Sequence, residues 1–191
     1  VCRSMLAIIL AWAAQAMPLR GAGVDSGIDI PDFGTNRPPV QTFYLPIPEN
    51  DLLTALKIIE NGRSATPPTD PMQTYVSLAV FVDGTVIYYD QWENGYDRDI
   101  ANPNNIYSAS NLGGTQIWGD GDPSNGTAPG YSTDKLSAGD VIILANAVKS
   151  TTRQSVIDWD GSDKIGVTKP IAVTRAGWAT GSNTLLAGAN E

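Results

Sequence analysis

The sequence predicts a mainly β protein, an antiparallel β-sandwich with one short N-terminal helix and long acidic loops. Short runs of β-branched and aromatic residues, separated by turn signals, recur along the chain. These runs do not alternate with helical patterns, which disfavours a parallel α/β sheet. The one clear helical periodicity lies near the start of the predicted domain, residues 41–191.

The N-terminus carries the features of a secretory signal peptide. Residues 6–16, LAIILAWAAQA, form an apolar run behind Arg3, and Ala14-Gln15-Ala16 supplies a cleavage pattern. The run is too short to span a bilayer as a helix, which needs roughly 20 residues. A buried amphipathic helix is the alternative. We predict a signal peptide at 1–16, no transmembrane segment, and a secreted or cell-surface location.

The segments that flank the domain indicate a piece of a longer protein. Cleavage would remove Cys2, the only cysteine, and leave a mature chain without disulfides. Residues 17–40, with four Gly and four Pro, predict a flexible linker. The chain starts with Val, and its end, LLAGANE, reads as the middle of a sequence. We therefore expect further domains of the same chain to be partners of this one.

The domain opens with a predicted strand and helix. Residues 41–47, QTFYLPI, predict a strand, which Pro46 ends or places at an edge. A helix capped by Asn50 or Asp51 follows, Asn61-Gly62 ends it, and residues 63–72 form a loop. One apolar stripe at helical spacing consists of Leu52, Leu53, Leu56 and Ile59.

The strongest local pattern is a predicted hairpin. Residues 74–82, TYVSLAVFV, and 85–90, TVIYYD, are separated only by Asp83-Gly84. Such a two-residue link favours a type I′ turn, because Gly and Asp tolerate positive φ. The residues expected to share one face of the first strand are Val76, Leu78, Val80 and Val82.

The second half of the chain begins with a long loop region. Residues 91–138 hold seven Gly, six Asn and five Asp, and contain one short predicted strand at 115–119. Residues 140–148 are apolar on both faces, which predicts a central strand. Further strands are predicted at 153–159 and 169–178, with 164–167 as another candidate.

Composition limits the function classes. A net charge of −8 disfavours a nucleic-acid partner, because phosphate binding needs a basic face. The absence of His removes Ser-His-Asp and Cys-His catalysis, and His-based zinc or haem sites. The residues form no catalytic constellation, so we predict a protein that is not an enzyme.

Two acidic loops are candidate calcium sites. In YYDQWENGYDRD, four carboxylates fall within ten residues, and a hard cation would relieve their repulsion. A solvated loop with Arg98 as counterion is the alternative. WGDGDPSNGTAPG begins like a calcium loop but fails the EF-hand pattern, so Asx turns explain it equally well. The candidate ligands are Asp90, Glu93, Asp97, Asp99, Asp120 and Asp122.

Convergence of these loops would let one cation bind four carboxylates. The residues that would then share it are Asp90, Asp97, Asp120 and Asp122. A third acidic segment, DWDGSDK, is predicted as a turn first and a cation site second; its acids are Asp158, Asp160 and Asp163.

Aromatic residues near the acids suggest a sugar ligand. Exposed Trp92, Tyr96 and Trp118 would stack on a sugar ring, and paired carboxylates are the residues of glycoside hydrolysis. Asn125-Gly126-Thr127 is an N-glycosylation sequon, which makes Asn125 a candidate glycan attachment site.

Four segments carry a resemblance to known proteins: YYDQWENGYD, WGDGDPSNG, LSAGDVIILAN and SDKIGVTKPIAVTRAGW. Over roughly residues 41–191, the chain resembles the N-terminal module of large secreted surface proteins. The last two segments are similar in style to the N-terminal domains of IgGFc-binding proteins. This resemblance implies an extracellular adhesion or structural role without catalytic residues. Mucus-type crosslinking is not implied, because the cysteines of the mucin-linked animal proteins are absent.

The expected function is that of a non-catalytic extracellular structural or adhesion module of a larger surface protein. Calcium is a candidate cofactor that would rigidify loops 91–138, and the partner would be an extracellular protein or a glycan. The alternative is a carbohydrate-binding or carbohydrate-cleaving domain that uses the same Trp- and Asp-rich loops. A purely architectural domain, whose acidic loops serve solubility, is the third hypothesis.

Overall fold

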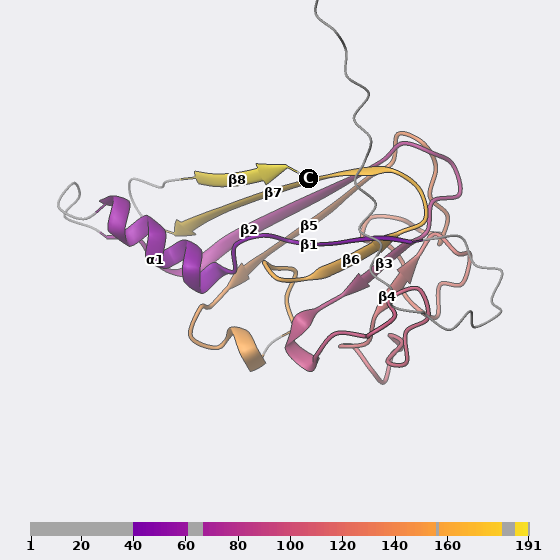
Figure 1. The fold of residues 1–191 in the computed structure, drawn as a ribbon, viewed down its shortest axis with the longest axis horizontal. Coiled ribbons are helices and arrows are strands. Elements are labelled where there is room, and N and C mark those ends of the chain that lie inside the picture. The colour runs from indigo at the N-terminus through magenta and orange to yellow at the C-terminus, as the bar shows by residue number, and fades with distance from the viewer. Residues whose placement is uncertain (1–39, 61–66, 156, 181–185, 191) are drawn as a thin grey trace, which may run out of the picture. The chain divides into compact units, whose positions relative to one another are not determined.

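The computed structural model describes residues 40–60, 67–155, 157–180 and 186–190, all within one unit, Asn36–Glu191. These residues form two antiparallel four-stranded sheets, one α-helix and two short 3₁₀-helices (Figure 1). The prediction of a mainly β protein with antiparallel sheets and one helix is confirmed.

The first sheet has the strand order β1-β6-β3-β4. Three of its strands are buried along their whole length, because loop residues cover the face that points away from the second sheet. Ile100 from the 91–115 loop packs there against Tyr88 and Ile117. The strands are β1 (Gln41–Tyr44), β6 (Lys164–Val167), β3 (Ile87–Asp90) and β4 (Gln116–Trp118).

The second sheet has the strand order β5-β2-β7-β8, which can be followed in Figure 1. From Met72 to Val80, buried and half-buried residues alternate along its longest strand, as expected for a strand with one face toward the core. The strands are β5 (Val141–Val148), β2 (Thr69–Val80), β7 (Ile171–Thr180) and β8 (Leu186–Asn190).

The buried apolar residues fall into groups that join these elements. The largest group takes side chains from both sheets, including Val76, Leu78, Val173, Ile87, Tyr89 and Ile165. A separate group joins helix α1 (Glu49–Glu60) to the second sheet, where Leu52, Leu53 and Leu56 pack against Met72 of β2 and Ala179 of β7. The predicted stripe is therefore confirmed at its three leucines. It is wrong at Ile59, which is 52% exposed.

The predicted hairpin at Asp83-Gly84 is wrong. Strands β2 and β3 lie in different sheets, and the neighbours of β2 are β5 and β7. The connection crosses between the sheets, where Gly84 has φ 65° and donates its N–H to Leu136 O. Val82 consequently lies beyond the end of β2 and is 40% exposed, so it does not share the buried face.

Two other strand predictions need correction. The predicted central strand at 140–148 is β5, which lies at the edge of its sheet and exposes Val141 and Ile143. The predicted strand at 153–159 is absent, because Arg153–Ser155 form a 3₁₀-helix, η2, and the described residues that follow are irregular. The N–H groups of Thr152 and Ser155 donate to the carbonyl oxygens of Lys149 and Thr152, so the backbone curls here instead of extending beside another strand.

The remaining element predictions agree with the structure within their bounds. The strands expected at 41–47, 115–119, 164–167 and 169–178 correspond to β1, β4, β6 and β7. Helix α1 starts at Glu49, just before the predicted caps. Strand β2 starts at Thr69, inside the predicted 63–72 loop, and β8 was not predicted.

Some predictions concern segments outside the described residues. The signal peptide at 1–16, the linker at 17–40 apart from Val40, and the Asn61-Gly62 helix end belong to this group. Among the residues that the structure describes, no helix has the length and apolar character that a membrane span requires.

Candidate functional site

A buried ion-pair cluster lies between helix α1, η2 and β7. We define it as Glu49, Arg153, Asp160 and Arg175, each no more than 7% exposed. Arg153 donates from Nε and Nη2 to the two carboxylate oxygens of Asp160, at 2.7 and 2.9 Å. Glu49 accepts from Arg153 Nε at 3.3 Å and from Arg175 Nη2. Two guanidinium groups and two carboxylates thus neutralise one another inside the domain.

The backbone brings these four side chains together from distant parts of the chain. Glu49 is the first residue of α1, Arg153 begins η2, and Arg175 points inward from β7. Gly161, in the turn before β6, donates its N–H to Glu49. A Cβ on Gly161 would lie 2.5 Å from Ile47 O, so only glycine permits this close approach.

A second set of buried acid groups continues from the cluster toward β3. Asp163 accepts from the hydroxyl of Tyr89 at 2.7 Å and from the N–H of Asp160 at 3.0 Å. Its other oxygen, Oδ1, is buried without a hydrogen-bond partner among the described residues. Burial, and then the nearby charge of Asp160, raise the pKa of Asp163 well above its usual range. Burial, and then the charge of Glu49, also raise the pKa of Asp160, while the guanidinium of Arg153 opposes this shift.

An open groove lies beside the ion-pair cluster. It encloses about 550 Å³. Seven of its nine lining residues carry a hydroxyl, an amide or an indole N–H, and none carries a carboxylate. The groove is lined by Pro48, Asn50, Trp92, Ser150, Thr151, Thr152, Arg153, Gln154 and Ser155.

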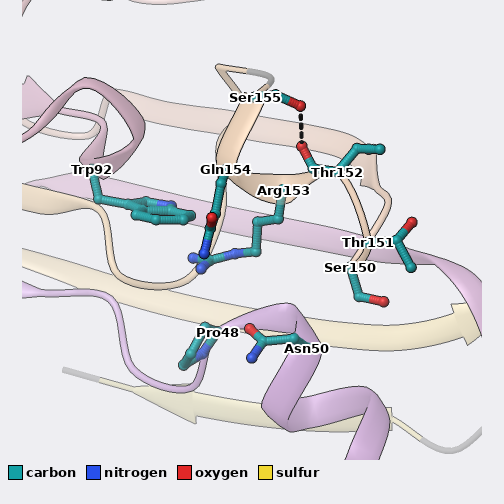
Figure 2. A pocket seen from close by; sticks show the side chains of 9 residues that line it. All are labelled: Pro48, Asn50, Trp92, Ser150, Thr151, Thr152, Arg153, Gln154 and Ser155. Atoms are coloured by element: carbon teal, nitrogen blue, oxygen red, sulfur yellow. Dashed lines mark hydrogen bonds between the residues drawn. The ribbon is translucent and has the colours of Figure 1, made fainter.

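The indole of Trp92 is held in place by the cluster. Its Nε1 donates to Asp160 at 3.0 Å, and the guanidinium of Arg153 lies 4.1 Å from the ring centroid. Figure 2 shows Trp92, Arg153 and Gln154 on one side of the groove, with Pro48 and Asn50 at the start of α1 on the other. The ion pairs therefore fix the aromatic wall of the groove.

The acids of the first loop are not gathered into one site. Asp97 donates its N–H to Asp90 at 2.8 Å, and its own carboxylate accepts from Asn104 N and the Thr115 hydroxyl. Burial raises the pKa of Asp90 to about 6. Asp99 is exposed and accepts from Ala101 N. Asp90 and Asp97 thus have partners within the protein.

Glu93 lies apart from them, beside the third acidic segment. Its Oε1 accepts from the N–H of Asp158 at 3.3 Å, and its Oε2 is buried without a partner among the described residues. Burial raises the pKa of Glu93 to about 7. Burial, and then the charge of Glu49, also raise the pKa of Asp158.

The acids of the second loop form local turns. Asp120 accepts from Asp122 N and Asn125 Nδ2, both at 2.8 Å. Asp122 accepts from Ser124 N and is fully exposed on its carboxylate. Asp134 accepts from Gly119 N and Gly121 N, and burial together with the neighbouring Asp120 raises its pKa. In the described part of the chain, no group of three or more acidic or sulfur or imidazole ligands is placed to hold a metal ion.

The predicted ligand-binding aromatics separate into three environments. Trp92 lines the groove, and its role in ligand binding stays a prediction. Trp118 is 0% exposed and packs against Tyr89 and Trp159, so the prediction of an exposed Trp118 is wrong. Tyr96 is 44% exposed but lies elsewhere, edge-on to Tyr44 with its hydroxyl on Ser162 O.

Asn125, the candidate glycosylation residue, is half-buried in the second loop. Its Nδ2, the atom to which a glycan would be attached, donates to Asp120. Its Oδ1 is buried without a partner in the described part of the chain.

Sequence reasoning missed most of the groove. The hydroxyl run at 150–152 and Arg153 follow a long apolar strand, and that change in composition was the available signal. The apolar residues at 156 and 157 led to the prediction of a strand instead. Comparisons of the chain with protein-family models, curated proteins and solved structures find no match, so the resemblance to secreted surface modules stays a prediction.

Proposed function

We propose that this chain is a non-catalytic β-sandwich module of an extracellular surface protein, and that it binds a glycan in the groove beside Trp92. The core supports the sandwich, because buried side chains from both sheets belong to one apolar group. The signal-peptide pattern at the N-terminus supports export. The resemblance described above supports a surface location and a larger protein with further domains.

The residue types that line the groove are the main support for a glycan ligand. Sugars present a hydroxyl-covered rim and apolar ring faces, so their sites combine an aromatic ring with uncharged hydrogen-bonding groups. The indole of Trp92 supplies the ring. The hydroxyls and amides are those of Asn50, Ser150, Thr151, Thr152, Gln154 and Ser155.

The charge distribution favours a neutral sugar over an acidic one. Arg153 is the one charged residue among those that line the groove, and Asp160 and Glu49 already neutralise it. The chain as a whole carries a net charge of −8. An anionic ligand would therefore meet a repulsive field without a free cation to bind it.

A non-catalytic role is supported by the partners of the acids nearest the groove. A glycosidase needs an acid and a second carboxylate directed at the bound sugar. Asp160 is instead bonded by Arg153 and Trp92, and Glu93 accepts from Asp158 N. Neither carboxylate lines the groove.

A glycan array followed by titration of the best neutral hit tests the proposal. Thr151→Ala and Gln154→Ala remove exposed groove groups and should weaken binding roughly tenfold in total. Trp92→Ala should abolish detectable binding. Thr174→Ala, an equally exposed threonine on β7, is the matched control and should bind as the unmodified chain does.

Two results would overturn the assignment. One is an array without a hit. The other is a hit whose affinity is the same in Thr151→Ala and Gln154→Ala as in the control, because the ligand would then bind outside the groove. Release of reducing sugar from the bound glycan would contradict the non-catalytic part of the proposal.

We also propose that a bound calcium ion stabilises the acidic loops. Its support is the closeness of Asp120 to the buried Asp134, a pair of like charges that a cation would relieve. Thermal unfolding with calcium and with a chelator tests it. A higher unfolding temperature in calcium is expected, and equal unfolding temperatures would show that calcium does not stabilise the folded domain.

A further inference from the structure

Strand β5 is a long edge strand with an open side. Its eight residues, Val141–Val148, pair with β2 in continuous register without a bulge. Among the described strands, β2 is its one partner, because β5 ends the sheet order. Figure 1 shows it at the margin of the sheet, with β7 and β8 beyond β2.

This edge lacks the devices that usually prevent strand pairing. Natural edge strands are short, or carry a charge, a proline or a bulge. β5 contains no charged residue and no proline, and its outward side chains at Val141 and Ile143 are 48% and 49% exposed. The edge strands of the first sheet are far shorter, with four residues in β1 and three in β4.

The backbone direction shows which groups are free. Asp140 O accepts from Val80 N, so even-numbered residues of this strand direct their N–H and C=O groups toward β2. Odd-numbered residues direct theirs to the open side. These are Val141, Ile143, Ala145 and Ala147. Of these groups, the carbonyl of Val141 accepts from the Tyr131 hydroxyl at 3.2 Å.

We propose that β5 is a self-association surface: two copies of this chain pair through their β5 strands, antiparallel and about a twofold axis at Leu144. The two second sheets then form one continuous sheet across the dimer. Such pairing satisfies the open backbone groups of both strands, which is the source of affinity in strand addition. The contact is isologous, so it closes at two copies.

The register at Leu144 is selected by the side chains and the backbone together. It places odd residues opposite odd residues, which keeps the two faces of the sheet aligned and joins the free N–H and C=O groups. Each larger outward side chain then faces an alanine. Val141 lies opposite Ala147 of the other copy, and Ile143 lies opposite Ala145.

Charge also favours a second copy as the occupant. The chain carries a net charge of −8, so two copies repel unless they meet where no acid is present. The eight residues of β5 offer such a place. At each end, the register places Gly139 of one copy opposite Lys149 of the other and Asp140 opposite Val148, so no acid faces an acid across the contact.

The covering contacts that the structure gives leave this side open. The segment at Asp158 and Trp159 bonds to β5 through the side chain of Asn146, an even-numbered residue on the inner face. Tyr131 reaches the strand at its first residue. The outward groups from Ile143 to Ala147 lie between these contacts.

Sedimentation velocity of the 191-residue chain over a range of concentrations tests the proposal. We expect a monomer–dimer equilibrium, weakened about tenfold or more by Ile143→Lys and by Ala145→Pro. The proline removes an N–H that points away from β2, so the fold of the monomer is retained. Thr174→Lys adds the same charge to the outer face of β7, away from the edge, and should dimerise normally.

Amide hydrogen exchange supplies the second measurement. Protection of the N–H groups of Ile143, Ala145 and Ala147 should rise with chain concentration, while even-numbered residues stay protected throughout. A chain that is monomeric at about 1 mM overturns the proposal. So does a dimer that Thr174→Lys weakens as much as Ile143→Lys, because copies would then meet through the sheet face.

Discussion

Single residues at the ion-pair cluster explain how a strongly acidic chain buries charge. Glu49 accepts from two guanidinium groups and one backbone N–H, so its carboxylate oxygens are fully used. Burying ions is costly unless each has partners of opposite charge, and these four residues supply one another. The same contacts hold Trp92, so the aromatic wall of the groove depends on residues that a ligand never touches.

Glu49→Gln should destabilise the domain by about 3–5 kcal/mol, because it leaves two buried guanidinium groups short of a counterion. Urea unfolding measures this change. Asp51→Asn, two residues further along α1 and exposed, should change the stability by no more than about 0.5 kcal/mol. Equal stability of the two variants would mean that the cluster contributes little.

Asp120→Asn tests the acid pair of the second loop. In the presence of a chelator, the variant should be more stable by a few tenths to about 1 kcal/mol, because the charge beside the buried Asp134 is gone. With calcium bound as proposed, the same variant should be less stable than the unmodified chain. Thermal unfolding under both conditions separates the two effects, and a variant that behaves alike in both would argue against the ion.

At this scale, the sequence could predict residue chemistry but not exposure. Trp92 and Trp118 both belong to the acidic, loop-rich segment 91–138, yet one lines a groove and the other is fully buried. Burial depends on which segments pack above a side chain, and those segments are distant in sequence. The partners of Arg153 were hidden for the same reason, since Glu49 lies 104 residues away.

Among the elements, helix α1 shows that an apolar pattern stabilises the fold only where a neighbouring element buries it. Its three leucines pack on Met72 and Ala179, while Ile58 and Ile59 are 70% and 52% exposed. The helix therefore carries more apolar residues than the sheet covers, and the sequence pattern places Ile59 in the same stripe as the three leucines.

Leu56→Ala should cost about 2–5 kcal/mol of unfolding free energy, because it opens a cavity against the second sheet. Ile59→Ala should change the value by less than about 0.5 kcal/mol. Chemical denaturation of the two variants provides the comparison. A similar loss from both would show that the exposed face of α1 is covered in solution.

The strands show where local patterns stop being informative. An alternating apolar run identifies β2 correctly, and Asp83-Gly84 is a turn sequence. Neither says whether the chain turns back within one sheet or crosses to another. Both sides of β2 are taken by β5 and β7, so β3 has no free side to pair with. The apolar residues of β5 likewise predict a strand with a buried face, but they do not predict that it lies at the edge of its sheet.

For the molecule as a whole, buried acids should make stability depend on pH. The pKa of Glu93 is raised to about 7 and that of Asp90 to about 6. The folded state then holds protons that the unfolded chain releases near its ordinary, lower pKa values. Raising the pH therefore favours unfolding, and the free energy of unfolding should fall from about pH 4 to about pH 7.

Denaturant titrations across this pH range measure the slope. Glu93→Gln removes one of the acids and should flatten the slope while raising stability at the upper end of the range. A domain that becomes more stable with rising pH would contradict the inferred direction. Ionic strength should be held constant, because the net charge of −8 adds a screened contribution.

The class of the whole molecule could be predicted because it follows from the number and kind of elements, and short apolar strands with one helix leave few architectures. The assignment of strands to two sheets could not, since pairing joins residues far apart in the chain. The composition limits the possible chemistry, because a chain without His has no His-based site.

The crossing between sheets after β2 has a consequence for how the chain acquires its structure in time. β2 ends at Val80, but the two strands that pair with it, β5 and β7, lie beyond residue 140. β1 likewise pairs with β6, which comes late in the chain. During synthesis, the first half of the domain therefore emerges with unpaired apolar strands and no partner to close against. Folding should be concerted and late, on the millisecond-to-second scale typical of distant strand pairing. Until β5 and β7 have been made, both edges of β2 are unpaired and open to aggregation.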